Sequence, residues 1–360
     1  MNIFYISNMF PSKKSNDNYG IFCKNVYDAL NDEKFKVTHL AVIQGKSFNR
    51  VYNVFRYIFL IFKIYVIGLF CSKSFDVIYF QYVWFHVFLS ILIIKRWRRN
   101  AKKLILNFHG EDLLGFLNEP NSKKNNFLVE SADRIIFPSV YFKNLFLEKY
   151  SASENKLFVS PSGGVNKEIF FADNKSIDFR EHRIVFCSRF AKDKGWDDFI
   201  NAAVLIHKKR IDFQFILIGY GEELAFAKKL INQNSAESYI KILEGLTQQK
   251  IAEIYRKSIL FVFPTRRLSE SLGLVALEAM SCGLAVVGSN IAALPEYIKN
   301  GHNGLLFEKG NPNDLSDKII MFLKLSSEKK EQFSLNAFET SKQYEQNKVL
   351  ADLKDNLIKL

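Results

Sequence analysis

Two carboxylates, Glu270 and Glu278, are separated by seven residues in a stretch rich in glycine and small side chains. This stretch follows an apolar, strand-like run, Ile259–Phe263, and a helical pattern begins within it at Gly273. A helix that begins at a glycine after a buried strand presents free backbone N–H groups at its positive end, which form a site for an anion. Carboxylates accept hydrogen bonds from sugar hydroxyls. The combination predicts a ligand with both phosphate and sugar, such as a nucleotide sugar.

Structural roles for the two carboxylates stay open at this point. Glu270 has the position of a helix-capping acid, and Glu278 that of a solvated or salt-bridged helix residue. Eight helical steps would place them about 12 Å apart, whereas a glycoside hydrolase needs roughly 5–9.5 Å between its carboxylates. A loop before Gly273 would shorten the distance, so the spacing disfavours hydrolysis without excluding it.

Two cations, Arg189 and Lys194, follow another expected strand, Ile184–Cys187, and precede a helix. Arg suits a bidentate contact with phosphate and Lys supplies a point charge, so together they could neutralise a diphosphate. A solvated basic loop is the alternative for either residue alone. Because the carboxyl ends of parallel strands meet at one sheet edge, we expect both cations near Glu270 and Glu278.

Two further turns belong to the same expected edge. Gly219 and Gly221 follow the strand expected at Phe213–Ile218, where they would let the backbone approach a ligand closely. Backbone groups around Leu246 are expected to contact a nucleobase, and Thr247 is expected to cap the next helix. The convergence of these loops on one edge is stronger evidence for a ligand site than any one motif.

The first half contributes two candidates, Gly20 and His109. Residues 2–7 read as a buried strand, Asn8–Tyr19 as a polar loop, and Gly20 as the start of a helix. This order is typical of the first unit of a doubly wound domain. His109 comes directly after the strand expected at Lys103–Phe108 and would point into the ligand crevice; a structural histidine is the alternative.

The 360 residues, 48% of them hydrophobic, are enough for two ordinary domains. Strands and helices alternate in each half, which predicts two parallel sheets wrapped by helices. The expected strands of the second half are Ile184–Cys187, Phe213–Ile218, Ile259–Phe263 and Leu284–Val287. Its expected helices are 195–209, 222–234, 247–257, 272–282 and 290–299, with a long amphipathic helix over about 331–360. Residues 161–182 combine turn residues with charge and indicate a link between domains.

The cysteines show no metal or redox spacing, which favours a reducing cytoplasm. They are Cys23, Cys71, Cys187 and Cys282. The start, Met1–Ile6, enters a strand pattern without a basic flank or cleavage site, which predicts that there is no signal peptide.

Net charge is +13, and residues 1–180 hold 25 Lys and Arg against 15 Asp and Glu. A basic first half fits nucleic acid, an anionic membrane surface, a phosphorylated acceptor or a merely soluble surface. The run Val51–Phe70 approaches the length of a membrane span, but Arg56 and Lys63 interrupt it. A charge near mid-bilayer costs roughly 2.5–3.5 kcal/mol, so a packed or interfacial helix is expected.

Trp97 lies among the cations of Lys95–Arg99 at the end of a second apolar run, Val83–Ile94. This arrangement predicts an interfacial anchor beside anionic lipid head groups. The alternative is a core helix with a basic, solvated end.

Taken together, these motifs resemble the retaining GT-B glycosyltransferases of family 4, and the resemblance covers nearly the whole chain. The most specific match is Glu270-x7-Glu278 within ESLGLVALEAMSCGLAVVGSN, in the right order after SRFAKDKGW. The other matching segments are the Gly20 loop, FDVIYFQ, NFHGEDL, SPSGGVNKEIF, LIGYGEE and LPEYIKNGHNGLLF.

The resemblance implies an α/β GT-B fold, in which two doubly wound Rossmann-like domains face each other across a cleft. It implies an acceptor-side domain at 1–165, a link at 166–182 and a nucleotide-sugar-binding domain at 183–335. A closing helix at 336–360 would pack back on the first domain.

It also implies roles for the donor-side residues. Arg189 and Lys194 would bind the donor diphosphate and support the leaving group. Glu278 would hold the ribose hydroxyls, and Glu270 would contact the donor sugar near the reacting centre. Gly219, Gly221 and Leu246 complete the expected nucleotide-binding set.

The remaining roles concern backbone groups and the first domain. Backbone amides of Leu272, Gly273 and Leu274 would touch phosphate or sugar. His109 would face the donor sugar, and Gly20 would let its loop approach phosphate or acceptor. Only one glycine marks this loop, where the family often shows two, and this departure weakens the acceptor-side roles.

The implied activity is transfer of a sugar from a UDP- or GDP-sugar to a hydroxyl acceptor, with no metal and no further cofactor required. The acceptor would be a glycan or lipid-linked glycan of bacterial capsule, O-antigen or lipopolysaccharide. The protein would be cytoplasmic, in peripheral contact with the anionic inner face of the plasma membrane, with no nucleic acid partner. Two alternatives remain: a sugar-nucleotide epimerase or phosphorylase on the same fold, and a non-catalytic nucleotide-sugar-binding subunit.

Overall fold

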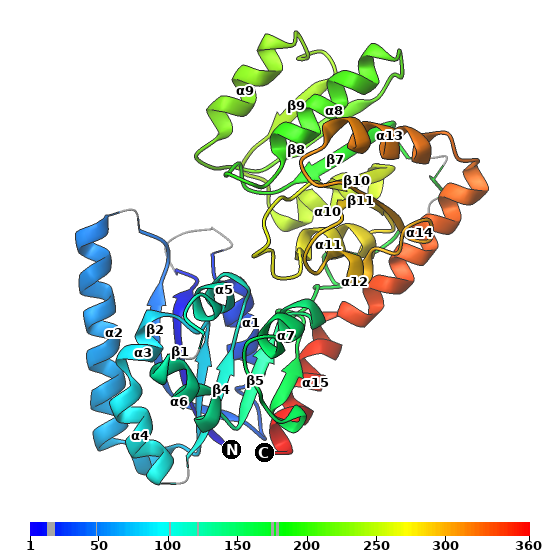
Figure 1. Cartoon of the computed structure of the whole chain (residues 1–360). Helices are drawn as coiled ribbons and strands as arrows, with labels where there is room; N and C mark the ends of the chain where they lie inside the picture. The colour runs from blue at the N-terminus through cyan, green and yellow to red at the C-terminus, as the bar shows by residue number, and fades with distance from the viewer. Residues whose placement is uncertain (13–18, 48, 101, 121, 174–175, 178–179) are drawn as a thin grey trace. The chain divides into compact units, whose positions relative to one another are not determined.

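The computed structural model describes residues 1–12, 19–47, 49–100, 102–120, 122–173, 176–177 and 180–360. The chain forms two compact units (Figure 1). Unit 1 comprises Met1–Gly163 and Val349–Leu360, and unit 2 comprises Gly164–Lys348. The chain therefore divides at Gly163, and the segment 166–182, expected as a link, belongs to unit 2 as far as it is described.

Unit 1 contains a six-stranded parallel sheet with the order β2-β1-β3-β4-β5-β6. The strands are β1 (Asn2–Phe10), β2 (Lys36–Gln44), β3 (Val77–Gln81), β4 (Lys103–Asn107), β5 (Arg134–Phe137) and β6 (Leu157–Val159). Almost every residue of β1 and β3 is buried, as expected for parallel strands that are covered on both faces. The expected loop Asn8–Tyr19 is shorter than predicted because β1 continues to Phe10, and residues 13–18 lie outside the described part of the chain.

Helices cover both faces of this sheet. They are α1 (Ile21–Ala29), α2 (Arg50–Phe70), α3 (Phe85–Leu89), α4 (Ile91–Arg99), α5 (Glu111–Leu117), α6 (Lys123–Ser131), α7 (Val140–Leu147) and α15 (Gln346–Ile358). One face packs against α1 and α15. Leu353 and Leu357 of α15 join Tyr5 of β1 in a buried cluster. The closing helix thus returns to unit 1, and it does so from Val349 onward.

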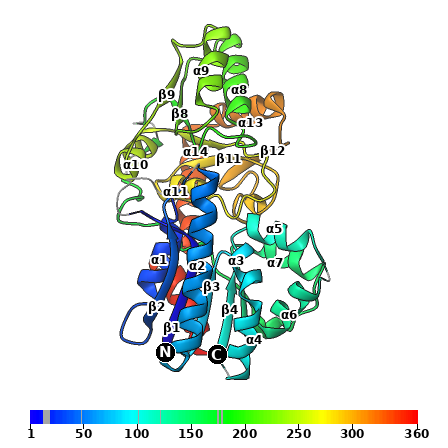
Figure 2. The ribbon, with the colours of Figure 1, turned by 90° about the vertical axis from the view of Figure 1, so that its left-hand side faces the viewer.

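The opposite face packs against α2, α4 and their neighbours, and Figure 2 shows α2 in front of this sheet. Leu60, Ile64 and Ile67 of α2 are buried there. The expected helix over Val51–Phe70 is therefore present, and one side of it is packed. Among the described residues, α2 is the one helix long and apolar enough to cross a membrane. Only 17% of its most apolar 18-residue stretch is buried.

The expectation that Trp97 is an interfacial anchor is wrong. Its side chain is fully buried, and the indole Nε1 donates a hydrogen bond to the carbonyl oxygen of Gly68 at 3.2 Å. The ring also makes edge contacts with Phe4 and Phe75. Trp97 fills the space over Gly68 between α2 and α4, so the alternative, a core helix with a basic end, describes α4.

Unit 2 contains a second parallel sheet, with the order β12-β11-β10-β7-β8-β9. Its strands are β7 (Arg183–Cys187), β8 (Gln214–Ile218), β9 (Ile240–Leu243), β10 (Leu260–Phe263), β11 (Ala285–Ser289) and β12 (Gly304–Phe307). Its helices are α8 (Trp196–Lys208), α9 (Leu224–Gln233), α10 (Gln248–Lys257), α11 (Leu274–Ser281), α12 (Leu294–Tyr297), α13 (Pro312–Leu323) and α14 (Ser327–Ser341). Helices α8, α9 and α13 bury their apolar sides on one face, and α11 packs against α14 and β11 on the other.

Three elements of unit 2 were not predicted from the sequence: β9, β12 and α13. Both strands are four residues long and lie at the edges of the sheet, so their burial is incomplete and their apolar signal is weak. The helix expected at 290–299 is reduced to the single turn α12, which begins just before Pro295. The long helix expected over 331–360 is two helices, α14 and α15, with a short helical turn at Lys342–Tyr344 between them.

Candidate functional site

The order of strands in unit 2 identifies where a ligand binds in such a sheet. From β7 the chain builds outward through β8 to β9, and it then returns to the other side of β7 with β10. The strands β7 and β10 are neighbours, and the loops that follow them lead to opposite sides of the sheet at the carboxyl ends of the two strands. This divergence is the crevice in which open parallel sheets bind ligands. The first loop carries Arg189 and Lys194, and the second carries Glu270 and Gly273.

Lys194 and Glu270 form an ion pair across these two loops. The Nζ atom of Lys194 lies 2.7 Å from Oε2 of Glu270, and the two side chains are 11% and 12% exposed. Thr265 Oγ1 donates a second hydrogen bond to the same oxygen at 3.1 Å. Burial raises the pKa of Glu270, but Lys194 and Thr265 outweigh it, so the pKa is lowered and the carboxylate is ionised. Glu270 is not a capping residue, because the helix α11 has no side-chain cap.

Arg266 holds the two loops together, and the sequence analysis missed it. Its backbone N–H donates to the carbonyl oxygen of Asp193 at 2.8 Å. Its guanidinium donates from Nε to Asp198 Oδ2 at 2.8 Å and from Nη2 to Asp197 Oδ2 at 2.9 Å. The two acids lie in the first turn of α8, directly after Lys194 and Gly195. The available signal was an arginine after one strand and an acidic pair after another, in loops expected at the same sheet edge.

Glu278 lies one helical turn inside α11, and its environment differs from that of Glu270. Its carboxyl makes no ion pair or hydrogen bond with any residue that the structure describes. Burial raises its pKa to about 7. The salt-bridged role considered for this residue is therefore absent from the described part of the chain. A carboxyl that is partly buried and unpaired beside a ligand crevice is free to bind polar groups of a ligand.

The helix α11 begins at Gly273, which has left-handed backbone angles, φ 75° and ψ 55°. A side chain here would also overlap the ring of Phe263, so glycine is required twice over. Leu272 is buried and Leu274 is the first helical residue. The N–H group of Ala276 donates to the carbonyl oxygen of Gly273 at 2.9 Å, whereas those of Leu274 and Val275 have no partner among the described residues and can face a ligand. Tyr297 was missed by the sequence analysis. Its buried hydroxyl lies 3.2 Å from where a Gly273 Cβ would be, and it has no hydrogen-bond partner among the described residues.

The other predicted donor-side residues lie on neighbouring loops. Arg189 is exposed after β7, and its guanidinium has no partner in the described chain. Gly219 and Gly221 pack against this loop, since a Cβ on either would overlap the backbone carbonyl of Ser188 or Phe190. The two glycines therefore allow the loop after β8 to pack closely against the loop after β7.

The last predicted donor-side position lies after β9. Leu246 is half-buried there, and Thr247 caps α10 as expected, by accepting a hydrogen bond from Lys250 N.

In unit 1, His109 is fixed in one neutral form. Gln81 Oε1 accepts a hydrogen bond from Asn107 Nδ2, so the Gln81 amide nitrogen faces His109 Nε2, at 2.8 Å. The Nε2 atom is then an acceptor, which assigns the ring proton to Nδ1. Burial lowers the pKa of His109 to about 3. The ring also lies 4.6 Å, between centroids, from Phe22 on α1, close to Gly20, which begins that helix.

Unit 1 also contains two cavities that share lining residues. The larger, of about 500 Å³, is lined by Trp84, Phe116, Asp112 and Glu119, among others. Asp112 accepts hydrogen bonds from the backbone N–H groups of Val83 and His109, while burial raises its pKa to about 7.

The smaller cavity, of about 350 Å³, is almost entirely apolar and is lined in part by Val54, Ile58 and Ile61 of α2. Tyr57 and Leu89 line both cavities. The two cavities therefore adjoin, and together they have a polar end and an apolar end.

Within the described residues, no group of three or more His, Cys, Asp or Glu side chains could hold a metal ion. All four cysteines are free thiols.

Comparison with solved structures identifies the class to which this fold belongs. HepE of Anabaena, in a crystal structure with UDP and glucose, superposes with a TM-score of 0.72 at 16% identity, covering 100% of both chains. At this identity the likeness concerns the fold alone, and that fold is the GT-B fold of glycosyltransferases, with its two parallel six-stranded sheets. Residues 168–340 match the model of the glycosyl transferases group 1, and the chain belongs to this family.

Relatives in sequence carry the same family relationship. An uncharacterised glycosyltransferase of Methanocaldococcus jannaschii is 33% identical over 241 residues, which cover 67% of this chain and 64% of that protein. The N-acetyl-alpha-D-glucosaminyl L-malate synthase of Bacillus anthracis is 25% identical over 261 residues, covering 70% of this chain and 66% of the synthase. The chain thus spans slightly less than two thirds of the length of each relative.

Proposed function

We propose that this protein is a glycosyltransferase that moves a sugar from a UDP- or GDP-sugar to a hydroxyl acceptor with retention at the anomeric carbon. The observation that carries the proposal is the buried Lys194–Glu270 ion pair beside the N-terminus of α11. It combines a cation for phosphate, a carboxylate for sugar hydroxyls and free backbone donors in one crevice. Family membership and the UDP-bound relatives in fold point to the same donor class.

Each donor-side residue then has a chemical role. Arg189 and Lys194 bind the diphosphate, and the amides of Leu272 to Leu274 add hydrogen bonds to it. Glu278 accepts hydrogen bonds from the ribose hydroxyls in its ionised form. Glu270 contacts the donor sugar and holds Lys194 in place before the donor arrives.

The reaction itself requires no covalent intermediate with the protein. The bond between the anomeric carbon and the diphosphate oxygen breaks, and its electron pair leaves with the diphosphate. The acceptor oxygen bonds to the anomeric carbon on the same face, and its proton passes to the departing diphosphate. Lys194 and Arg189 accelerate this step because they stabilise the negative charge that develops on the leaving group. We propose that His109, with its proton on Nδ1, donates a hydrogen bond to a hydroxyl of the donor sugar, and that Gly20 serves the acceptor side.

For the acceptor we propose a glycan carried on a lipid, in the assembly of a bacterial surface polysaccharide. The two adjoining cavities of unit 1 support this choice, because the polar end at Asp112 suits a glycan and the apolar end on α2 suits a hydrocarbon chain. The protein would work in the cytoplasm, in peripheral contact with the inner face of the plasma membrane. A soluble hydroxy acid is the alternative acceptor, since one relative in the family is named a malate synthase of that kind.

The test is release of nucleoside diphosphate from a panel of UDP-, GDP- and ADP-sugars, with and without bacterial lipid extract. We expect release from one donor, stimulated by the extract and lost in Lys194→Ala. Interconversion of free nucleotide sugars without any acceptor would instead identify an epimerase or phosphorylase. Donor binding without release under every condition would contradict a transferase and indicate a binding subunit.

A further inference from the structure

The outward side of α2 is apolar along its whole length. Every residue from 51 to 70 that is exposed is an aliphatic or aromatic one. These residues are Val51, Tyr52, Val54, Phe55, Ile58, Phe59, Phe62, Val66, Leu69 and Phe70, and their exposed fractions range from 37% to 82%. We call this set the α2 ridge. A soluble surface helix normally carries polar residues on this side, so the ridge marks an interaction surface.

The inward side of α2 fixes how the ridge can meet a partner. Leu60, Ile64 and Ile67 are buried in the core of unit 1, and Arg56 donates hydrogen bonds to the backbone carbonyls of Gln44 and Gly45. These contacts hold the helix flat against the domain. The ridge can therefore lie on a bilayer surface. The helix α2 could cross the bilayer only if its buried residues left the core of unit 1.

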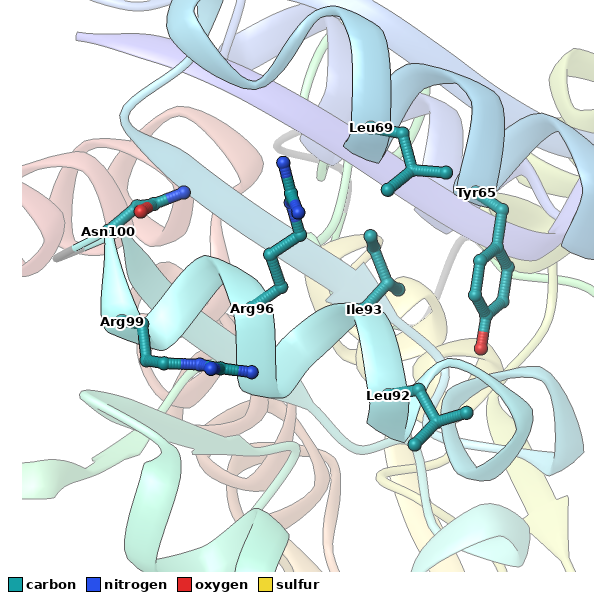
Figure 3. A pocket seen from close by; sticks show the side chains of 7 residues that line it. All are labelled: Tyr65, Leu69, Leu92, Ile93, Arg96, Arg99 and Asn100. Carbon is teal, nitrogen blue, oxygen red and sulfur yellow. The ribbon is translucent and has the colours of Figure 1, made fainter.

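A basic groove adjoins the ridge between α2 and α4. Figure 3 shows this cavity of about 520 Å³, with Arg96 rising between the two helices and Arg99 following it on α4. Leu69 of the ridge and Tyr65 line the α2 side, and Leu92, 71% exposed, lines the α4 side. Neither arginine has a hydrogen-bond or ion-pair partner among the described residues.

We propose that the α2 ridge and this groove form a docking face for an anionic phospholipid bilayer, with a lipid phosphate bound by Arg96 and Arg99. Guanidinium groups bind phosphate through paired hydrogen bonds. The apolar side chains that line the same groove suit the hydrocarbon immediately below a head group. A broad apolar ridge beside cations is the combination that holds a helix in the bilayer interface.

Charge selects a bilayer over a second copy of the chain. A two-fold dimer brings the same patch of both copies together, so the arginines of both grooves would lie in one interface. Their like charges would repel, and none of the described residues that line the groove is acidic. An anionic lipid surface supplies the missing negative charge, and the first half of the chain is basic overall.

The inference rests on the membrane contact in the proposed function and gives that contact a location. Val54 and Ile58 of the ridge also line the apolar cavity of unit 1, so a lipid-linked acceptor would have a short path from the bilayer into that cavity. Binding to vesicles needs no donor and no catalysis. A failure of docking is therefore distinguishable from a failure of the transferase proposal.

The experiment is flotation of the full chain with vesicles of phosphatidylcholine alone, and with vesicles in which about a third of the lipid is phosphatidylglycerol. Arg96→Glu/Arg99→Glu tests the groove, and Lys208→Glu/Lys229→Glu makes the same charge change at exposed positions of unit 2. Phe55→Ser/Phe59→Ser tests the ridge. Phe226→Ser is its control, because Phe226 is 63% exposed on α9. Thermal unfolding and nucleoside diphosphate binding confirm that each variant is folded.

We expect the wild type and both controls to bind the anionic vesicles, with weaker binding to phosphatidylcholine alone. The groove variant should lose more than about tenfold in affinity for anionic vesicles, and the ridge variant should lose binding to both kinds. Equal losses in the groove variant and its charge control would overturn the phosphate site. Protection of Arg96 and Arg99 from phenylglyoxal by inorganic phosphate, without vesicle binding, would show an anion site rather than a docking face. A wild-type dimer that the ridge variant dissociates would assign the ridge to a second copy.

Discussion

The ammonium group of Lys194 and the carboxylate of Glu270 lie 2.7 Å apart, although the two residues are far apart in sequence and follow different strands. Both side chains are almost buried, so removing either one would leave a buried charge without its partner. In the proposed function, the donor diphosphate would offer Lys194 a second anion beside Glu270. The ion pair would then hold Lys194 in place before the donor binds.

Removing either partner should destabilise the fold. Lys194→Ala or Glu270→Ala should each lower the free energy of unfolding by about 3 kcal/mol, because the remaining charge is buried and unpaired. The double variant should lose less than the sum. Chemical denaturation of the four proteins measures this coupling, and additive losses would show that the pair contributes nothing.

The same pair gives a dependence on acid. The pKa of Glu270 is lowered in the folded state, so the pair stabilises the fold above the ordinary carboxyl pKa of 4.5. This contribution is lost as the pH falls through the lowered value. Glu270→Gln should flatten the acid side of the unfolding curve, and an unchanged acid limb would contradict the ionised pair.

Ionisation of Glu278 should lower the stability of the fold but raise the affinity for the donor. Its raised pKa of about 7 means that the fold favours the protonated form, so this contribution is lost as the pH rises from about 4.5 to about 7. Glu278→Gln should stabilise the protein at pH 8, on the order of 1 kcal/mol because the side chain is partly exposed, but not at pH 5.

Donor binding gives the second half of this test. In the wild type the affinity for nucleoside diphosphate should rise with pH through about 7, as Glu278 ionises, and in Glu278→Gln it should be weak and flat. Titration calorimetry at several pH values measures both curves. Glu237→Gln, at an exposed position on unit 2, is the control. A variant that keeps the wild-type pH dependence would remove Glu278 from the ribose site.

Arg266 should act by positioning Lys194 rather than by touching the donor. Arg266→Ala leaves Asp198 buried without its partner and should cost about 2–3 kcal/mol, less than a fully buried pair because the guanidinium is partly exposed. Turnover should fall mainly through kcat, with a smaller change in KM. Arg266→Lys should restore stability in part, since lysine offers charge but not the two-acceptor geometry. Full activity in the alanine variant would contradict the positioning role.

His109 should not titrate in the working range of the enzyme. Burial keeps its pKa at about 3, so the ring is neutral from about pH 5 to pH 9. His109→Gln should lower kcat without changing the shape of the pH–rate profile. A limb near pH 6.5 that disappears in this variant would show instead that His109 acts as an acid or base.

Much of the fold was predictable because parallel strands are apolar runs with loops of distinct chemistry after them. The strands β7, β8, β10 and β11 were expected within one or two residues. Placement at the carboxyl edge then predicted that Lys194 and Glu270 would be close. Short edge strands such as β9 gave no comparable signal.

Other features depend on three-dimensional neighbours that a pattern does not contain. The helix α2 is apolar on both its packed and its exposed side, so periodicity could not say which side is buried. The sequence predicted a membrane anchor at Trp97, which is buried in the core. Trp97 packs over Gly68 because glycine has no side chain that would overlap the indole ring. Gly68 lies on another helix, so sequence spacing does not reveal this contact. The ion pairs of Arg266 likewise join loops that sequence spacing leaves unconnected. The position of the Tyr297 hydroxyl near Gly273, without a hydrogen-bond partner among the described residues, also follows from the three-dimensional packing.

The most direct test of the account is transfer of isotope-labelled sugar from the identified donor to extracted bacterial lipid. Wild type, Lys194→Ala and Lys192→Ala would be compared, because Lys192 is an exposed lysine of the same loop. We expect labelled lipid product from the wild type and Lys192→Ala, and a loss of at least about 100-fold in Lys194→Ala. Equal transfer by Lys194→Ala and the wild type would contradict the central claim that Lys194 and Glu270 form the donor site.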